Sequence, residues 1–332
     1  MTADLITLAR AGDGDAFREL TEPHRRELHV YCYRMLGSLQ DAEDSLQETL
    51  LAAWRGLAAF EGRSSFKTWL YRIATRKCLN ALRLARRRPA RQWDLPEVEP
   101  PEPTGFGAAV WLEPYPDALL AGAIEVPLGP EAHFERTEAI SLAFVAALQL
   151  LPPRQLAVLI LRDVLGFHAQ EVADMLASTV ESVNSALKRA RASLQRRRPA
   201  EEHQESPASN SPSEQAVLAD FVSAWESADL DALVALLTDD VFISMPPMPL
   251  EYEGRDVVAR FCTSIFRSGR RFDLVRTRAN GQPAFGAYLR APSGIRHGVG
   301  LYVLTLRGNR ICTMTHFDNS VLPWFGLPQS LP

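Results

Sequence analysis

Hydroxyl and basic side chains gather on one face of a predicted helix that ends near residue 194, and their chemistry suits contact with nucleic acid. The opposite face of this helix is apolar at spacings of 4, 3 and 4 residues, through Val183, Leu187, Ala190 and Leu194. The polar face carries Ser182, Ser185, Lys188, Arg189 and Arg196. Because hydroxyl and guanidinium groups bond both phosphates and base edges, this helix can enter a DNA major groove.

A shorter predicted helix around residues 171–176 precedes the polar-faced helix. Its apolar residues Val172, Ala173 and Leu176 are expected to pack across the second helix. The turn, the apolar spacing and the basic exit together predict a helix-turn-helix within residues 152–194. An ordinary helical hairpin with a solvated charged face stays the alternative.

Two further helices carry charge on one side. In the helix that begins near Ser38, a possible capping residue, an apolar stripe contains Leu46, Leu50, Ala53 and Leu57. The opposite face of that helix is acidic, through Asp41, Asp44 and Glu48. A Gly/Ser break at residues 62–65 leads to a helix over residues 66–85, in which Arg72, Arg76 and Arg83 share an outer face.

A possible small-molecule site lies near the end of the chain. His316 and Asp318 are two residues apart in a predicted strand, so both side chains are expected on one face. Other side chains that could line a cavity with them are Met245, Met248, Tyr252, Tyr288 and Tyr302. A His and an Asp on one face do not by themselves establish acid–base catalysis.

Charge is strongly segregated along a chain of 332 residues whose net charge is −4. Residues 62–91 hold ten Lys or Arg and no acid, residues 92–138 hold ten acids and one Arg, and residues 182–198 hold six Lys or Arg and no acid. A basic segment attracts phosphate through its local potential, whatever the total charge. The net charge therefore argues only against a uniformly basic nucleic-acid binder.

Several other classes of protein do not fit the sequence. The four cysteines lie far apart without zinc-ligand spacing, so we expect buried, reduced thiols, no metal and no cofactor. No signal peptide is evident, and no apolar stretch approaches 18 residues. These features predict a cytoplasmic protein without a membrane span.

Composition divides the chain into helical and mixed parts. Helices are expected over residues 1–89 and 135–198, separated by an acidic, proline-rich linker at residues 90–134 that includes the aromatic stretch WLEPYPD (111–117). A Pro/Ser-rich joint at 199–214 leads to an α+β domain over 215–332. That domain is predicted to have helices near 216–237 and 256–267. Antiparallel strands are expected near 272–278, 284–290, 298–306 and 310–318, with a hairpin turn at Gly308-Asn309.

Two segments resemble sigma-70 family initiation factors of the extracytoplasmic-function group. Residues 41–83 (DAEDSLQETLLAAWRGLAAFEGRSSFKTWLYRIATRKCLNALR) are similar to the family's region 2, and residues 151–194 are similar to its region 4. The part after residue 214 resembles a SnoaL-like domain, a cone-shaped α+β barrel with a central cavity. His168 and Ala177 depart from the usual capping residue and turn glycine of region 4, at a cost of about 1 kcal/mol for a lost cap.

The resemblance implies roles for the charged faces. The acidic residues Asp41, Asp44 and Glu48 would bind RNA polymerase core at its clamp helices, although acids near a helix start also complement the helix dipole. Region 4 would contact the polymerase flap. Arg72, Arg76, Lys77 and Arg83 would neutralise phosphates near the −10 element of promoter DNA. Trp69 and Tyr71 could stack on extruded bases, with Trp69 fitting a core position equally well. The implied −35 contacts are Ser185, Lys188, Arg189 and Arg191.

The role of the SnoaL-like domain is left open between small-molecule catalysis, binding of a small ligand and regulatory docking. Our hypothesis is that this domain and the acidic linker contact the sigma core and modulate its activity. Two rival functions for the whole chain remain. One is a helix-turn-helix regulator that acts without polymerase core, and the other is a fusion that carries a small-molecule enzyme.

Overall fold

The computed structural model describes residues 2–85, 101–107, 111–120, 141–196, 206–267 and 269–332. The chain forms two compact units, and the sequence segments of one unit alternate with those of the other. Unit 1 contains residues 1–88 and 119–200, and unit 2 contains residues 89–118 and 201–332. Part of the stretch expected as a linker therefore belongs to the same unit as the C-terminal domain.

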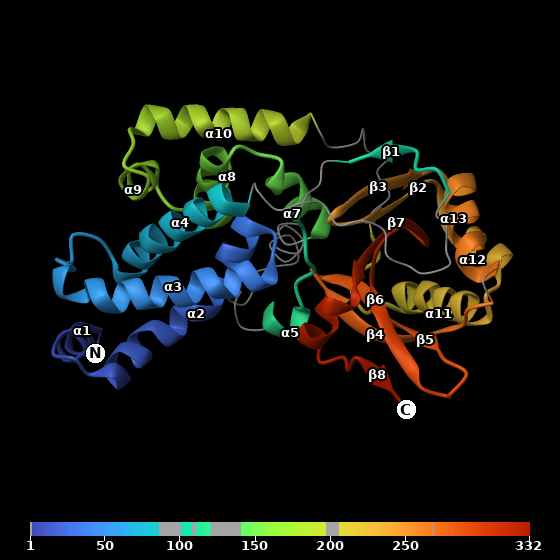
Figure 1. The fold of residues 1–332 in the computed structure, drawn as a ribbon. Coiled ribbons are helices and arrows are strands. Elements are labelled where there is room, and N and C mark those ends of the chain that lie inside the picture. Colours follow the sequence, from blue (N-terminus) through green and yellow to red (C-terminus); the bar gives the residue numbers. More distant parts are fainter. Residues whose placement is uncertain (1, 86–100, 108–110, 121–140, 197–205, 268) are drawn as a thin grey trace. The chain divides into compact units, whose positions relative to one another are not determined.

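The first half of unit 1 is a helical bundle of α1 (Thr2–Arg10), α2 (Gly14–Leu36), α3 (Leu39–Gly56) and α4 (Phe66–Ala85), with the short η1 (Leu57–Ala59) after α3 (Figure 1). The predicted cap at Ser38 is confirmed, because its Oγ accepts the amide of Asp41 at 3.1 Å. Tyr31 and Thr75 join α2 to α4 through a buried hydroxyl contact of 2.7 Å. Burial of apolar side chains on facing sides of α2, α3 and α4 stabilises this bundle.

The second half of unit 1 consists of α7 (Leu142–Gln149), α8 (Pro153–Leu159), η2 (Ile160–Val164), α9 (Ala169–Met175) and α10 (Val180–Gln195). The predicted helix-turn-helix is present as α9 and α10. Glu171 accepts the backbone amide of His168 at 2.9 Å, so the first turn of α9 is capped from within the helix. Thr179 caps α10 by accepting the amide of Ser182 at 3.2 Å.

The two halves of unit 1 pack together through α4. The ring of Tyr71 lies 5.1 Å from that of Phe167, and the two rings meet edge to face. The hydroxyl of Thr68 donates to Glu171 at 3.2 Å. These contacts place the start of the helix-turn-helix against one side of α4.

Unit 2 contains a sheet covered by helices (Figure 1). Its strands are β1 (Gly105–Phe106), β2 (Leu237–Met245), β3 (Met248–Glu253), β4 (Phe272–Ala279), β5 (Gln282–Arg290), β6 (Arg296–Arg307), β7 (Arg310–Asp318) and β8 (Ser330–Leu331). Their order is β1-β3-β2-β7-β6-β5-β4, with β8 paired to β6. The helices of this unit are α11 (Pro212–Ser227), α12 (Leu230–Ala235), α13 (Arg255–Arg267) and the short η3 (Asn319–Phe325). The short α5 (Asp117–Leu120) begins in unit 2 and ends in unit 1.

Four predicted strands and the hairpin turn at Gly308-Asn309 are confirmed in β4 to β7. The expected helix over residues 216–237 was too long, because the chain turns at Ala228 and enters a strand at residue 237. The strands β2 and β3 were not predicted, since the run TDDV and the prolines at 246 and 247 hide their alternation. The sheet is also not wholly antiparallel, because β2 and β7 run parallel.

The core of unit 2 lies between one face of the sheet and helices α11, α12 and α13. Trp225 is its largest buried side chain, and its ring contacts Phe221 at 5.6 Å and Tyr302 at 4.9 Å. All four cysteines of the chain are buried and free, as predicted. No helix in the described residues is long and apolar enough to cross a bilayer.

The turn between α9 and α10 offers a direct test of this fold. Ala177 is exposed and adopts a left-handed conformation with φ of 48°. The left-handed conformation costs a residue that has a Cβ roughly 1–2 kcal/mol, and glycine avoids this cost. Part of the resulting gain in stability is lost again, because glycine has more conformational entropy in the unfolded chain. Ala177→Gly should therefore raise the free energy of unfolding by about 1 kcal/mol.

Denaturant unfolding of the full chain measures this change. The matched control is Ala192→Gly, which lies inside α10 with right-handed geometry and should lower the stability by roughly 0.5–1 kcal/mol. Equal destabilisation by both substitutions would contradict the observed turn.

Candidate functional site

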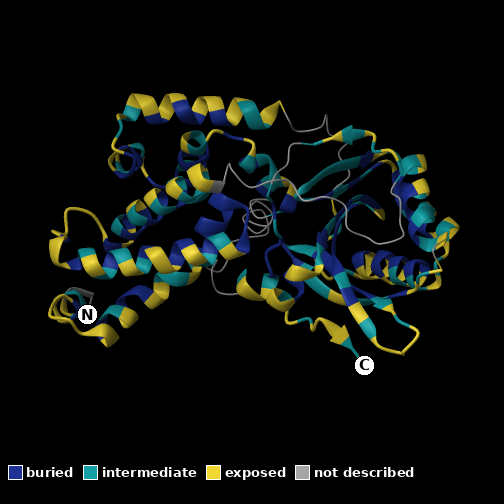
Figure 2. Cartoon of the chain, in the orientation of Figure 1, coloured by how far each residue is buried: buried dark blue, intermediate teal, exposed yellow. Residues whose placement is uncertain are grey.

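The polar face of α10 is open to solvent. Ser185, Lys188 and Arg189 are exposed, whereas Val183 and Leu187 are buried. Exposed and buried residues alternate along α10, which packs against α8 (Figure 2). The buried side fixes the rotation of the helix about its axis. The structure thus brings three of the four residues predicted for −35 contacts together on one exposed surface.

Arg191 has a different environment from the other predicted −35 residues. Its Nε and Nη2 atoms donate to the two carboxylate oxygens of Asp163 at 2.8 and 2.6 Å. The hydrogen bonds and the charge of Asp163 raise the pKa of the Arg191 guanidinium above its ordinary value. A planar guanidinium held in this fork braces α10 against η2. Asp163 was not identified from the sequence, because the two residues are 28 positions apart.

The outer face of α4 forms a second basic surface. Arg72, Arg76 and Arg83 are exposed, as their spacing predicted. Lys77 is half-buried, and its Nζ lies 3.1 Å from Oε2 of Glu48 on α3. One residue predicted to bind DNA is therefore paired with a residue predicted to bind polymerase. Surface ion pairs of this kind contribute about 0–1 kcal/mol, so the pair can exchange for another partner at little cost.

The two aromatic residues suggested for base stacking differ in their accessibility. Trp69 is half-buried, with its ring 4.9 Å from that of Phe60 and 5.7 Å from that of Phe66. The prediction for Tyr71 was wrong, because its side chain is fully buried between Tyr31 and Phe167. Burial raises the pKa of Tyr71. The face of α4 that carries Tyr71 is covered by other parts of unit 1, which the local spacing did not reveal.

The acidic face of α3 is also accessible. Asp44 and Glu48 are exposed, and Asp41 is half-buried next to the helix start. The side-chain amide of Gln40 donates to Asp44 at 3.2 Å. This surface offers carboxylates to a basic partner. Among the described residues, no cluster of three or more His, Cys, Asp or Glu could hold a metal ion.

The seven residues suggested for a ligand cavity do not form one site. Met248 is partly buried against the core of unit 2. Met245, Tyr252 and Tyr302 are buried in the core of unit 2, and the ring of His316 lies 4.7 Å from that of Tyr302. Burial lowers the pKa of His316 to about 4, so its imidazole is neutral at pH 7 and cannot serve there as a protonated acid.

Tyr288 and Asp318 have structural contacts outside this aromatic core. Tyr288 contacts the C-terminal segment, where its hydroxyl donates to the carbonyl of Pro328 at 2.9 Å. The carboxylate of Asp318 accepts the amide of Ser320 at 2.8 Å and caps η3. A shared strand face therefore did not predict a shared role for His316 and Asp318.

The aromatic stretch before α5 packs against the hairpin turn between β4 and β5. Tyr115 donates its amide to Oδ1 of Asn280 at 2.7 Å and accepts the amide of Asn280 at 2.8 Å. Its side chain is 1% exposed. Earlier in the expected linker, Pro101 also contacts the sheet of unit 2, because its carbonyl accepts the hydroxyl of Tyr252 at 3.1 Å. The dipeptide Asn280-Gly281 is typical of a tight turn, but no local pattern indicates that Tyr115 binds to it.

Comparison with known families assigns the parts of the chain. Residues 20–88 match Sigma-70 region 2, residues 141–194 match Sigma-70 region 4, and residues 218–314 match the SnoaL-like domain.

Curated relatives extend the match over nearly the whole chain. The chain is 43% identical over 341 residues to the ECF RNA polymerase sigma factor SigG of Mycobacterium tuberculosis, with 97% of this chain and 86% of the relative covered. It is 29% identical over 194 residues to SigM of the same species, with 58% of this chain and 83% of the relative covered.

A solved structure shares the fold. The extracytoplasmic function sigma factor SigJ of Mycobacterium tuberculosis superposes with a TM-score of 0.57 at 21% identity, covering 94% of this chain and 99% of that chain. The predicted architecture is thus confirmed. Two helical domains match Sigma-70 region 2 and region 4, and a SnoaL-like domain follows them. The chain belongs to the extracytoplasmic-function (ECF) family of RNA polymerase sigma factors, which bind polymerase core and promoter DNA and direct transcription initiation.

Proposed function

We propose that this sigma factor reads promoter DNA through two exposed basic faces and binds polymerase core through a third, acidic face. On α4, Arg72, Arg76 and Arg83 would neutralise phosphates near the −10 element, and Trp69 would form one wall of a pocket for an extruded base. The exposure of these three arginines along one side of a helix that is otherwise packed into unit 1 supports this role.

The recognition helix α10 would contact the −35 element. Ser185, Lys188 and Arg189 project from its exposed face and carry hydroxyl and cationic groups suited to phosphates and base edges. Arg191 would support −35 binding indirectly, because its ion pair with Asp163 holds α10 in place. Lys77 would join the DNA-binding surface only when it leaves Glu48.

The acidic face of α3 would bind basic residues of the polymerase clamp helices, and region 4 would contact the flap. The exposed carboxylates of Asp44 and Glu48 support this assignment, whereas Asp41 also interacts with the positive end of the helix dipole. Since polymerase acts in the cytoplasm, the protein would work there.

The SnoaL-like domain would modulate initiation through the acidic linker and the sigma core, and we assign it no catalysis. The neutral imidazole of His316 and the capping role of Asp318 argue against an acid–base pair. A bound small ligand is compatible with the indole N–H of Trp225, which is buried without a hydrogen-bond partner in the described structure. We therefore favour a SnoaL-like domain that modulates initiation over one that acts as an attached enzyme. A regulator that acts without polymerase would leave the basic face of α4 unused.

The first test separates a base- or phosphate-contacting arginine from a bracing arginine. Arg189→Ala should lower run-off transcription from a −35-dependent template by about tenfold, because one good contact is worth roughly 1–3 kcal/mol. Its denaturant unfolding should match that of the wild type. Arg191→Ala should lower the unfolding stability, because it leaves Asp163 without its bidentate partner.

Purified core polymerase and a template selected with the wild-type protein are needed for this comparison. Unchanged transcription with Arg189→Ala would remove that residue from the DNA-binding surface.

A second test concerns polymerase binding. Asp44→Asn should weaken the affinity for core polymerase several-fold at low salt, and the difference should shrink as salt rises, because exposed charges are screened. Glu19→Gln on α2 is the control, since Glu19 is also an exposed helical carboxylate but lies outside the acidic face of α3. Equal loss of affinity in both variants would show a general effect of charge and would count against this interface.

A third test addresses modulation by the C-terminal domain. A chain that ends at residue 204 lacks the domain to which residues 101–107 and 111–118 bind, so its transcription with core polymerase should differ from that of the full chain in yield or promoter choice. Run-off assays on the same genomic fragments compare the two proteins. Identical yields and identical start sites would refute modulation.

A further inference from the structure

A pocket lies between the start of α11 and the hairpin of β4 and β5. Its volume is about 240 Å³, which exceeds the roughly 150 Å³ of a protein cavity that accommodates benzene. All the residues that line it belong to unit 2. The pocket is therefore a feature of the SnoaL-like domain alone.

The inner side of this pocket is apolar. Leu218 and Phe285 line it, and both side chains are buried in the core of unit 2. Pro283 and Ala284, at the start of β5, line the same side. An apolar group of a ligand gains free energy when it covers such a surface, because water is displaced from both.

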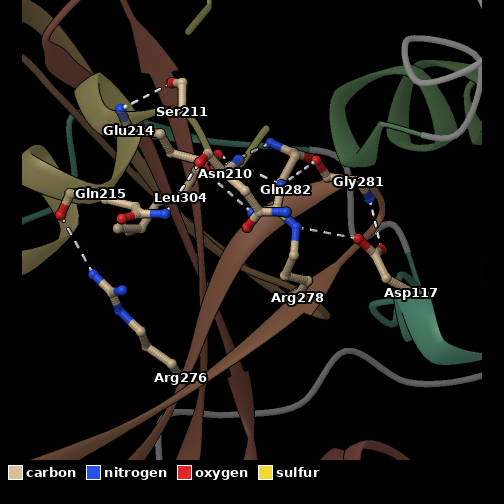
Figure 3. A network of polar contacts seen from close by, with 10 residues as sticks. All are labelled: Asp117, Asn210, Ser211, Glu214, Gln215, Arg276, Arg278, Gly281, Gln282 and Leu304. Atoms are coloured by element: carbon tan, nitrogen blue, oxygen red, sulfur yellow. Dashed lines mark hydrogen bonds and ion pairs between the residues drawn. The ribbon is translucent and has the colours of Figure 1, made fainter. Parts of the chain in front are cut away.

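A balanced ion pair forms one wall of the pocket. Nη1 of Arg278 lies 3.1 Å from Oε2 of Glu214, and Nε of Arg278 lies 3.4 Å from Oδ2 of Asp117 (Figure 3). The carboxylate of Glu214 also accepts the backbone amide of Asn210 at 2.6 Å, and its side chain is only 4% exposed. A buried carboxylate needs such partners. These charges therefore stabilise the start of α11 against β4 and are not free for a ligand.

Arg276 carries a positive charge that no carboxylate of the pocket balances. It lies two residues before Arg278 on β4 and pairs across the sheet with Phe285, so its side chain lies next to the apolar inner side. Arg276 is exposed, and its Nη2 atom lies 3.5 Å from the carbonyl of Gln215, at the outer limit of a hydrogen bond (Figure 3). Within the described part of the chain, its guanidinium forms no ion pair.

We propose that this pocket binds a small monocarboxylate with an apolar body. The guanidinium of Arg276 binds the carboxylate, and the apolar group lies against Leu218 and Phe285. A planar guanidinium matches a carboxylate through two parallel, charge-assisted hydrogen bonds. The lining holds two guanidinium groups and one carboxylate, so its excess of one positive charge suits a single negative charge on the ligand. The volume favours a body of about the size of one aromatic ring.

This site is separate from the aromatic core in which a ligand cavity was suggested from the sequence. Its lining contains neither Tyr302 nor His316. It requires no acid–base chemistry. It also does not depend on how the domain acts on initiation, so a test of binding is independent of the test of modulation.

Titration of the full chain with phenylacetate, followed by methyl NMR of labelled leucines, tests the site directly. The methyl resonances of Leu218 should shift and saturate at millimolar or lower concentrations of phenylacetate. Phenylacetamide is the neutral isostere, and inorganic phosphate is an anion without an apolar body. Both should bind at least about tenfold more weakly than phenylacetate, because each lacks one half of the recognition.

Three variants identify the residue that holds the carboxylate. Arg276→Gln should weaken phenylacetate binding about tenfold, and Arg276→Lys should weaken it less, because it keeps the charge but not the planar fork. The control is Arg260→Gln, since Arg260 is an exposed arginine on α13 outside the pocket and its loss should leave the affinity unchanged. Denaturant unfolding should be the same for all three variants as for the wild type, because neither arginine is buried.

Three results would overturn the proposal. The first is the absence of Leu218 shifts at millimolar phenylacetate. The second is binding of phenylacetamide or phosphate as tight as that of phenylacetate, which would show that the pocket does not recognise both parts of the ligand. The third is wild-type affinity in Arg276→Gln.

Discussion

The reciprocal backbone and side-chain hydrogen bonds between Tyr115 and Asn280 determine how the rest of this chain is organised. They attach a segment that lies between the two sigma domains in sequence to the SnoaL-like domain that follows both of them. Asn280 lies in the tight turn between β4 and β5, where its backbone adopts a left-handed conformation with φ of 58°. Segments of the two units therefore alternate along the sequence.

Ion pairs within the chain divide the basic residues into two groups. Arg72, Arg76 and Arg189 are exposed, and their charge is available to phosphate. Arg191 and Arg278 instead form hydrogen-bonded pairs with carboxylates and stabilise the packing of their own units. A guanidinium suits both uses, because its planar fork matches a carboxylate as well as a phosphate or a guanine edge. Residue type alone could not separate these groups.

Local sequence patterns predicted most of the helical half of the chain. The apolar spacing of residues 183–194, the cap at Ser38 and the basic stripe of α4 depend on neighbours within a few turns, so periodicity was sufficient for them. The exposure of Ser185 follows from the same spacing. Patterns of this kind fail where a distant segment covers a face, which is why Tyr71 was wrongly assigned to base stacking.

The C-terminal domain shows the limit of the same reasoning. The strands β4 to β7 alternate clearly, whereas β2 and β3 contain acids and prolines and are recognised only through their pairing with β7 and β1. Tyr288 and Tyr302 both lie on strands, but Tyr288 bonds to the C-terminal segment and Tyr302 lies in the core. The partners of Asp117 and Tyr115 are more than 160 residues away, beyond any local signal.

The attachment of the linker to the SnoaL-like domain can be measured by cutting the chain on both sides of the attached segment. Specific protease sites introduced near residues 95 and 130 would release residues 101–118 from both sigma domains, and size-exclusion chromatography would follow the fragment. After both cuts residues 131–332 stay one continuous chain, and the structure predicts that the fragment co-elutes with that chain through its contacts with the SnoaL-like domain. Elution of the fragment as a free peptide would contradict the account.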